Sequence, residues 1–168
     1  MRPPGDFHRG LRCLLFLLAL ALGGMLLQSP LADSDPAPAS DPAALVNPLA
    51  GTGAGGVFPG AATPFGMVQY SPNTDDAGGG GYNYAHPRTW GFATTHLSGP
   101  GCAAMGDVVS LPTTGRVRTV DATQQKTTFS HASEQASPGY YAVTLDRSKV
   151  RAELSATTHT GWARFSYP

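Results

Sequence analysis

The sequence has few cysteines and few charged residues. Two cysteines occur among 168 residues, charged residues make up 13% of the chain, and the formal net charge is zero. Cys13 lies in an apolar N-terminal segment that we expect to be removed, so the remaining chain keeps one thiol and cannot form an internal disulfide. No basic cluster is present, so the electrostatic signature of a nucleic-acid-binding protein is missing. We therefore do not expect DNA or RNA as a partner.

Helical periodicity is missing from the middle of the chain. Across residues 46–110, glycine and proline interrupt every window in which apolar residues could recur at helical spacing. This composition favours short strands joined by ordered loops. It predicts strands at 66–70 and 107–111, ended by Pro72 and Pro112.

The last third of the chain alternates between apolar and polar residues. Period two places two sets of side chains on common faces, namely Tyr141, Val143 and Leu145, then Val150, Ala152, Leu154 and Ala156. Turns at 146–149 and 159–161 leave room for an antiparallel meander that ends in a strand at 162–167. The predicted fold class is all-β, an antiparallel β-sandwich with long Gly/Pro-rich loops.

The N-terminus has the order of parts of a secretory signal. Basic residues precede the apolar run Leu14–Leu27, which is shorter than the roughly 20 residues needed to span a bilayer. We predict a signal peptide over residues 1–32, with cleavage there or as late as residue 39, and an extracellular protein; an uncleaved anchor is the alternative. Residues 33–44 form a Pro/Ala/Asp linker that is too polar to order itself. Residues 45–168 are long enough for one core and so for one domain.

Several catalytic motifs are incomplete. The run 51–56 matches G-x-G-x-x-G, but Pro59 and Pro64 exclude the helix that a dinucleotide site requires. Ser98 lacks the first glycine of a nucleophile elbow. The histidines do not have the spacing of a zinc site, and the scarce carboxylates do not identify an acid and base pair. The sequence therefore assigns no catalytic residue and no metal ligand to this chain.

Three groups of short motifs occur in order along residues 45–168. The first comprises 46–53, 58–61, 64–69 and 71–72; the second 91–92, 95–99, 101–102, 106–107 and 111–112; the third 129–131, Glu134, 138–141, 153–157, Gly161 and 164–165. Together they resemble the N-terminal domain of glycoside hydrolase family 92, whose members are mostly exo-acting α-mannosidases. Two departures are Asn73, where the family usually has aspartate, and the run 77–81, where it often has tryptophan.

This resemblance implies a β-sandwich packed against an (α/α) barrel. The barrel would supply the general acid, the general base and most of a calcium site, with inversion at the anomeric carbon. Calcium is expected for the full-length family enzyme, and none is expected to be bound by this chain alone. Because the chain stops at Pro168, we expect a fragment without the catalytic domain that is inactive alone. Its expected partners are α-mannosides, other glycans and the missing catalytic domain.

The resemblance also implies that this domain forms one wall of the sugar-binding cleft. We place that wall on a Gly-rich loop, because its backbone can approach a sugar and its polar groups can bind hydroxyls. The predicted substrate-binding residues are Thr95, His96, Ser98, Gly99, Cys102 and Asp107. Alternatively, the loop only packs against the barrel. For Cys102, a buried thiol, an interface residue and a reactive group all remain open.

Two other functions are compatible with the sequence. A stand-alone carbohydrate-binding β-sandwich is one alternative, and a non-functional remnant is the other. Binding modules usually offer exposed aromatic platforms, whereas Trp90 and Trp162 are the two tryptophans of the chain and Trp162 lies in a strand pattern. This favours the enzyme domain.

Overall fold

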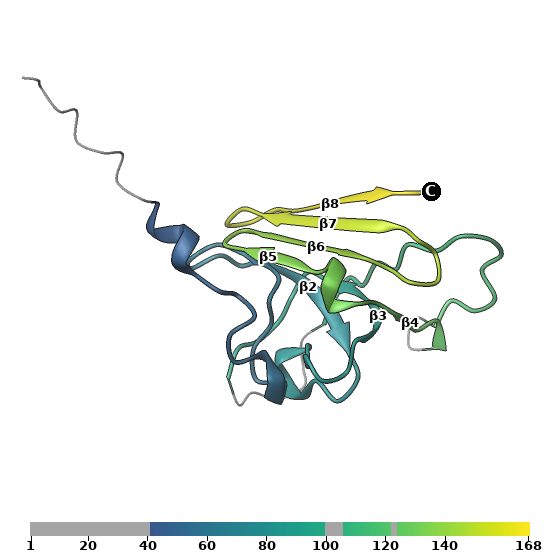
Figure 1. Cartoon of the computed structure of the whole chain (residues 1–168), viewed down its shortest axis with the longest axis horizontal. Coiled ribbons are helices and arrows are strands. Elements are labelled where there is room, and N and C mark those ends of the chain that lie inside the picture. The colour runs from purple at the N-terminus through teal and green to yellow at the C-terminus, as the bar shows by residue number, and fades with distance from the viewer. Residues whose placement is uncertain (1–40, 100–105, 122–123) are drawn as a thin grey trace, which may run out of the picture. The chain divides into compact units, whose positions relative to one another are not determined.

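The computed structural model describes residues 41–99, 106–121 and 124–168 (Figure 1). Two antiparallel four-stranded sheets build the domain. The first has the order β1 (Ala61–Ala62), β2 (Gln69–Thr74), β3 (Arg88–Ala93) and β4 (Thr127–Thr128). The second has the order β5 (Gln135–Ser137), β6 (Tyr140–Thr144), β7 (Arg151–Ala156) and β8 (Gly161–Ser166). The described helices are short 3-10 turns: η1 (Pro42–Leu45), η2 (Thr52–Ala54), η3 (Gly78–Gly80) and η5 (His131–Ser133).

One apolar core lies between the two sheets. It joins side chains of the first sheet, such as Tyr70 and Phe92, to Tyr141, Val143 and Leu154 of the second. Contacts between β2 and β7 bring the sheets together, as in a β-sandwich. The predicted all-β, antiparallel sandwich is therefore confirmed.

The predicted meander is also confirmed. Strands β6, β7 and β8 pair in sequence, with Val143 opposite Ala152 and Leu154 opposite Ala163. The β6–β7 turn closes through the Leu145 N–H, which donates to the Val150 carbonyl at 2.9 Å. All side chains predicted to face the core on β6 and β7 are buried.

Two strand predictions were wrong in extent. Strand β2 begins at Gln69, later than predicted, and continues through Pro72 to Thr74. Proline is tolerated there because the N–H and carbonyl of its partner Phe92 bond to Ser110, so Pro72 lies in a pair that exchanges no hydrogen bonds. The strand predicted at 107–111 is reduced to one bridge from Ser110 to Phe92, because Val108 has a positive φ of 51° that breaks the extended chain.

The predicted signal peptide and most of the predicted linker lie outside the described residues. Residues 41–44, which end the predicted linker, are exposed. In the part of the chain that the structure describes, no helix is long and apolar enough to cross a membrane.

Candidate functional site

A cavity of about 280 Å³ opens at the end of β2. It lies between β2, β3, the glycine-rich turn that contains η3, and the loop positions 96 and 106. Its lining includes Asn73, Trp90, His96, Gly79, Gly81 and Gly106. The chain therefore brings an imidazole, an amide and an indole to one concave surface lined by bare backbone, as small-molecule sites commonly do.

His96 forms the inner end of this cavity and is only 4% exposed. Its Nδ1 lies 2.7 Å from the Gln69 carbonyl oxygen, and its Nε2 lies 3.0 Å from Asn73 Oδ1. Burial lowers the pKa of His96 to about 4, although hydrogen bonds to the backbone of Gln69 and Pro72 act in the opposite direction. The ring is therefore neutral at physiological pH.

The Asn73 amide lies against Nε2 of this neutral ring. Its side chain is buried, and its Nδ2 has no hydrogen-bond partner among the described residues. A neutral imidazole that donates from Nδ1 to the Gln69 carbonyl needs a donor at Nε2, and a half-turn of the amide places the Asn73 Nδ2 there. In either orientation one atom of this buried amide lacks a hydrogen-bond partner among the described residues.

Two glycines allow the close approach of backbone at this site. Gly81 has a φ of 78°, and a Cβ there would lie 2.9 Å from His96 Nε2 and 2.9 Å from Asn73 Oδ1. Gly106 has a φ of 108° and lies against Asn73 and Trp90. A side chain at Gly81 would clash with the imidazole, and one at Gly106 would narrow the cavity. These two glycines therefore keep the cavity open.

Thr95 and Asp107 clamp the two ends of the predicted site loop. Thr95 Oγ1 donates to Asp107 Oδ2 at 3.1 Å and accepts from the Asp107 N–H at 3.0 Å. The Gly106 N–H also donates to the Thr95 carbonyl at 3.0 Å. These contacts give Thr95 and Asp107 a structural task, which is to hold the loop ends beside His96.

The other predicted residues are placed differently. Ser98 is exposed and does not line the cavity, and the Gly99 N–H donates to the Gly56 carbonyl at 2.6 Å. Cys102 lies outside the described residues. Sequence reasoning missed Asn73 and Trp90 as lining residues, because their proximity to His96 depends on strand pairing rather than on local spacing.

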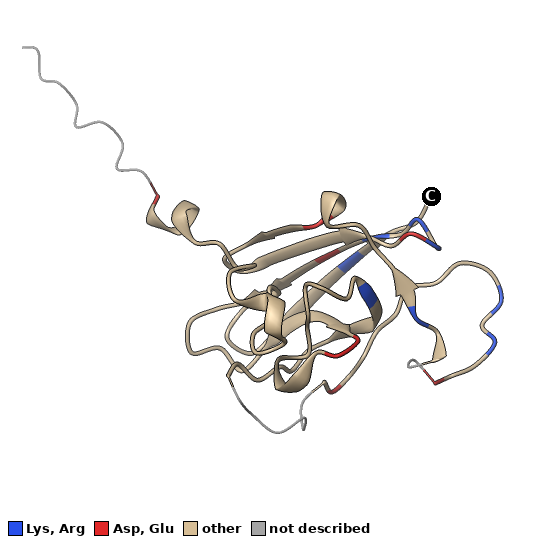
Figure 2. Ribbon diagram, turned by 60° about the horizontal axis from the view of Figure 1, so that its bottom comes forward, with Lys and Arg blue, Asp and Glu red and all other residues tan. Residues whose placement is uncertain are grey.

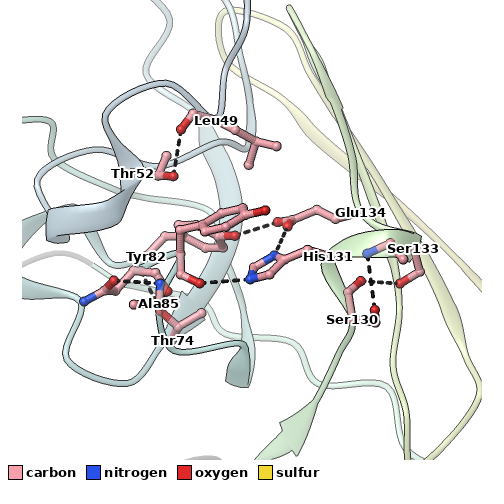
Figure 3. A network of polar contacts seen from close by, with 12 residues as sticks. Leu49, Thr52, Thr74, Tyr82, Ala85, Ser130, His131, Ser133 and Glu134 are labelled. Atoms are coloured by element: carbon pink, nitrogen blue, oxygen red, sulfur yellow. Dashed lines mark hydrogen bonds and ion pairs between the residues drawn. The ribbon is translucent and has the colours of Figure 1, made fainter.

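A second polar cluster joins the two sheets away from this cavity (Figure 3). Glu134, whose side chain is 1% exposed, accepts from Tyr82 Oη at 2.8 Å and from Tyr141 Oη at 2.6 Å. His131 Nδ1 lies 2.6 Å from Glu134, and its Nε2 lies 2.9 Å from the Tyr84 carbonyl oxygen. Burial, and then the Glu134 charge, raise the pKa of both tyrosines, so they stay neutral donors. The Glu134 carboxylate is buried and fully hydrogen-bonded, which suits a structural link rather than catalysis.

Asp75 lies directly after β2 and is held by two cations. Its carboxylate lies 2.5 Å from Lys126 Nζ and also pairs with Arg88. Burial acts against ionisation, but hydrogen bonds from Lys126 and Arg88 keep the pKa of this carboxyl below its usual range. Asp75 is thus tied into an ion pair network and is not a free acid or base beside the cavity.

Metal-binding side chains are dispersed in the described part of the chain. Within 41–99, 106–121 and 124–168, no three His, Cys, Asp or Glu side chains lie close enough together to hold a metal ion.

Known proteins share this architecture and sequence. A family model, that of the glycosyl hydrolase family 92 N-terminal domain, matches residues 45–168. A protein of Arthroderma benhamiae named as an uncharacterized secreted glycosidase is 31% identical over 135 residues, which is 73% of this chain and 17% of that protein.

Solved structures give the same result. A family GH92 α-mannosidase from Bacteroides thetaiotaomicron, solved in complex with mannoimidazole, is 43% identical with a TM-score of 0.69, over 75% of this chain and 18% of that one. The GH92 family glycosyl hydrolase ccman5 is 31% identical with a TM-score of 0.67, over 76% and 19% of the two chains. A family GH92 inverting mannosidase from Bacteroides thetaiotaomicron is 29% identical with a TM-score of 0.60, over 73% and 17%. The chain thus spans less than a fifth of the length of each of these relatives.

Proposed function

The chain belongs to glycoside hydrolase family 92, whose N-terminal domain it carries, and we propose that it forms one wall of the sugar-binding cleft of a secreted exo-α-mannosidase. The observation that carries the proposal is the cavity in which Asn73, Trp90 and His96 meet glycine backbone. Sites of this kind form at domain interfaces, and a catalytic domain packed here would complete the cleft.

The lining residues suit a pyranose. The Trp90 ring would cover an apolar face of the sugar, and the Asn73 side chain, which lines the same cavity, would bind one hydroxyl. His96 would fix the amide from behind rather than touch the sugar with both nitrogens, because both of its nitrogens already have partners. Thr95 and Asp107 would hold the loop, and Ser98, Gly99 and Cys102 would complete the wall towards the catalytic domain.

In this proposal the general acid, the general base and calcium belong to the catalytic domain. The described residues lack a metal-binding cluster, and the buried Glu134 is fully engaged by its tyrosine and histidine partners. The chain alone would therefore bind and orient a mannoside without hydrolysing it. Secretion is supported by the name of the Arthroderma benhamiae relative and by the signal-like N-terminus.

A domain exchange tests the proposal. Residues 45–168 would replace the matching domain of the 43% identical Bacteroides thetaiotaomicron α-mannosidase, and hydrolysis of an aryl α-mannoside would be measured. We expect an active chimera whose kcat/KM falls about 5- to 150-fold on Trp90→Ala, as for loss of about 1–3 kcal/mol of transition-state binding. Val120→Ala, at a fully exposed apolar side chain of the loop between β3 and β4 that does not line this cavity, is the control and should leave kcat/KM unchanged. An active chimera that tolerates Trp90→Ala would refute the proposed wall.

A stand-alone carbohydrate-binding module is the second candidate, favoured by one observation. Trp162 is 69% exposed on β8 and lines a shallow pocket with Tyr140 and Arg164. Such a module would bind methyl α-mannoside without a catalytic domain and would lose that binding on Trp162→Ala. Calorimetric titration of the chain separates the two functions, because the cleft wall depends on Trp90 and the module on Trp162.

A further inference from the structure

A second cavity, of about 240 Å³, lies under the long loop between β3 and β4. Its wall is built by segments that are distant in sequence, namely residues 111–119 and 124–127 on one side and the β6–β7 turn on the other. It shares no residue with the cavity at His96. Figure 2 shows blue Lys and Arg segments on this protruding loop, at the right of the view.

Three guanidinium groups line this cavity. Arg116 and Arg118 come from the loop, and Arg147 comes from the turn. Among the described residues, none of the three side chains forms a hydrogen bond or ion pair, whereas Arg88 and Arg164 both pair with carboxylates. The described residues that line the cavity include no Asp or Glu. Grouping three like charges without a counter-charge raises the free energy of the site, and a bound anion would lower it.

The remaining polar lining includes further hydrogen-bond donors. Thr119 and Ser148 contribute hydroxyls, whereas the Gln124 amide already donates to Asp121 Oδ2 at 2.7 Å. Ser148 is only 7% exposed and lies at the base of the turn beside Arg147. Arginine forks match the paired oxygens of a tetrahedral oxyanion, and hydroxyls supply further donors.

We propose that this cavity binds an oxyanion of the sulfate or phosphate type. The cavity is at the small end of ligand sites, which suits one such group or one sugar that carries it. Two sources share this chemistry, the free inorganic anion and an anionic glycan. The site is separate from the proposed mannoside cleft, so its test does not depend on the domain exchange.

Titration of the full chain with four probes tests this site. The probes are inorganic sulfate, inorganic phosphate, N-acetylglucosamine 6-sulfate and unsulfated N-acetylglucosamine, at constant ionic strength. We expect saturable binding of the first three and none of the fourth. Arg147→Gln should weaken binding roughly tenfold or more, as for loss of a charge-assisted contact. Arg151→Gln, which removes the same charge from β7, is the matched control and should leave the affinity unchanged.

Each outcome of this titration is decisive. Tighter binding of the sulfated sugar than of sulfate identifies a glycan site, and equal binding identifies a free-anion site. Absence of saturation in the millimolar range overturns the proposal. So does equal weakening by Arg147→Gln and Arg151→Gln, because that result reports general surface charge. Thermal denaturation of both variants verifies that each remains folded.

Discussion

His96 is enclosed by groups that fix its protonation state. The Gln69 carbonyl accepts a hydrogen bond from Nδ1, and the Asn73 amide lies beside Nε2. The residue is only 4% exposed. An isolated charge would be costly there, which is why burial outweighs the hydrogen bonds that favour the protonated form. The proposed sugar wall thus depends on a histidine that stays neutral.

This arrangement makes stability depend on pH. The pKa of His96 is about 4 in the folded domain, whereas an imidazole in the unfolded chain has a pKa of 6.5. Between these pH values the unfolded chain therefore binds one proton more than the folded domain. The free energy of unfolding therefore rises with pH. The contribution of His96 is present above pH 6.5 and is lost, by on the order of 3 kcal/mol, as pH falls to about 4.

Nuclear magnetic resonance titration of the His96 ring checks this prediction. The apparent pKa should lie well below 6.5 in the natural chain. Asn73→Asp places a carboxylate beside Nε2, which favours the charged ring, so it should raise the pKa of His96. A midpoint at 6.5 or above in the natural chain, or no change in Asn73→Asp, would contradict the proposed burial of a neutral ring.

At this scale the sequence led to part of the site. The motif around His96 was chosen because glycine and polar residues in an ordered loop are typical of ligand contacts, and His96 does line the cavity at the end of β2. That the loop contacts a sugar stays a prediction. The sequence could not show that Asn73, 23 positions before His96, contacts the same ring. That contact depends on how β2 lies beside the loop. Trp90 was missed for the same reason. Cys102 stays a prediction.

Among the elements, η5 links the two sheets. Glu134 follows directly after η5. Its carboxylate accepts hydrogen bonds from the hydroxyls of Tyr82, in the loop before β3, and Tyr141, on β6. The His131 ring stacks on Tyr84 with centroids 3.7 Å apart, which fixes the imidazole that meets the same carboxylate. One buried acid thus connects the turn, the loop and the core.

Removing the Glu134 charge should destabilise the whole domain. The two tyrosines bind Oε1 of Glu134 and His131 binds Oε2. In Glu134→Gln the NH₂ group replaces one of these oxygens and faces either the tyrosine hydroxyls or the His131 ring, so at least one buried hydrogen bond is lost. We expect a loss of about 3–5 kcal/mol in the free energy of unfolding, measured by urea denaturation. Asp76→Asn is the control, because the Asp76 side chain is 79% exposed and lies 3.6 Å from His86, so loss of its charge should change stability little. Equal losses in both variants would argue against a linking function for Glu134.

Strand positions were predictable to different degrees. The meander could be predicted because period two is unbroken over β6 and β7, and the turn residues between them fix the register. Strand β2 could not be placed correctly, because whether a proline ends a strand depends on which of its neighbours' groups face it. Pro72 is an example, because the backbone N–H and carbonyl of its partner Phe92 bond to Ser110, so the strand needs no N–H from Pro72.

The surface of the described domain carries apolar residues that a small monomer normally buries. Phe65 is fully exposed, Met67 is 69% exposed, and Trp162 is 69% exposed. Among the described strands, β8 pairs only with β7, so one of its backbone edges lacks a strand partner. An exposed edge next to an exposed tryptophan favours association with another chain. In the proposed function, part of this surface would contact the catalytic domain.

The isolated domain, residues 40–168, should therefore self-associate and bind a hydrophobic dye. Trp162→Lys places a charge beside the open β8 edge and should shift the protein towards a monomer in sedimentation velocity, because charged side chains protect edge strands from pairing. Val120→Lys is the matched control. Val120 is also fully exposed but lies in the loop between β3 and β4, so the same added charge there should leave the association unchanged. If both lysines dissociate the protein equally, net charge rather than the β8 edge controls association. A monodisperse monomer of the natural sequence that binds no dye would mean that the exposed apolar residues do not form a docking surface.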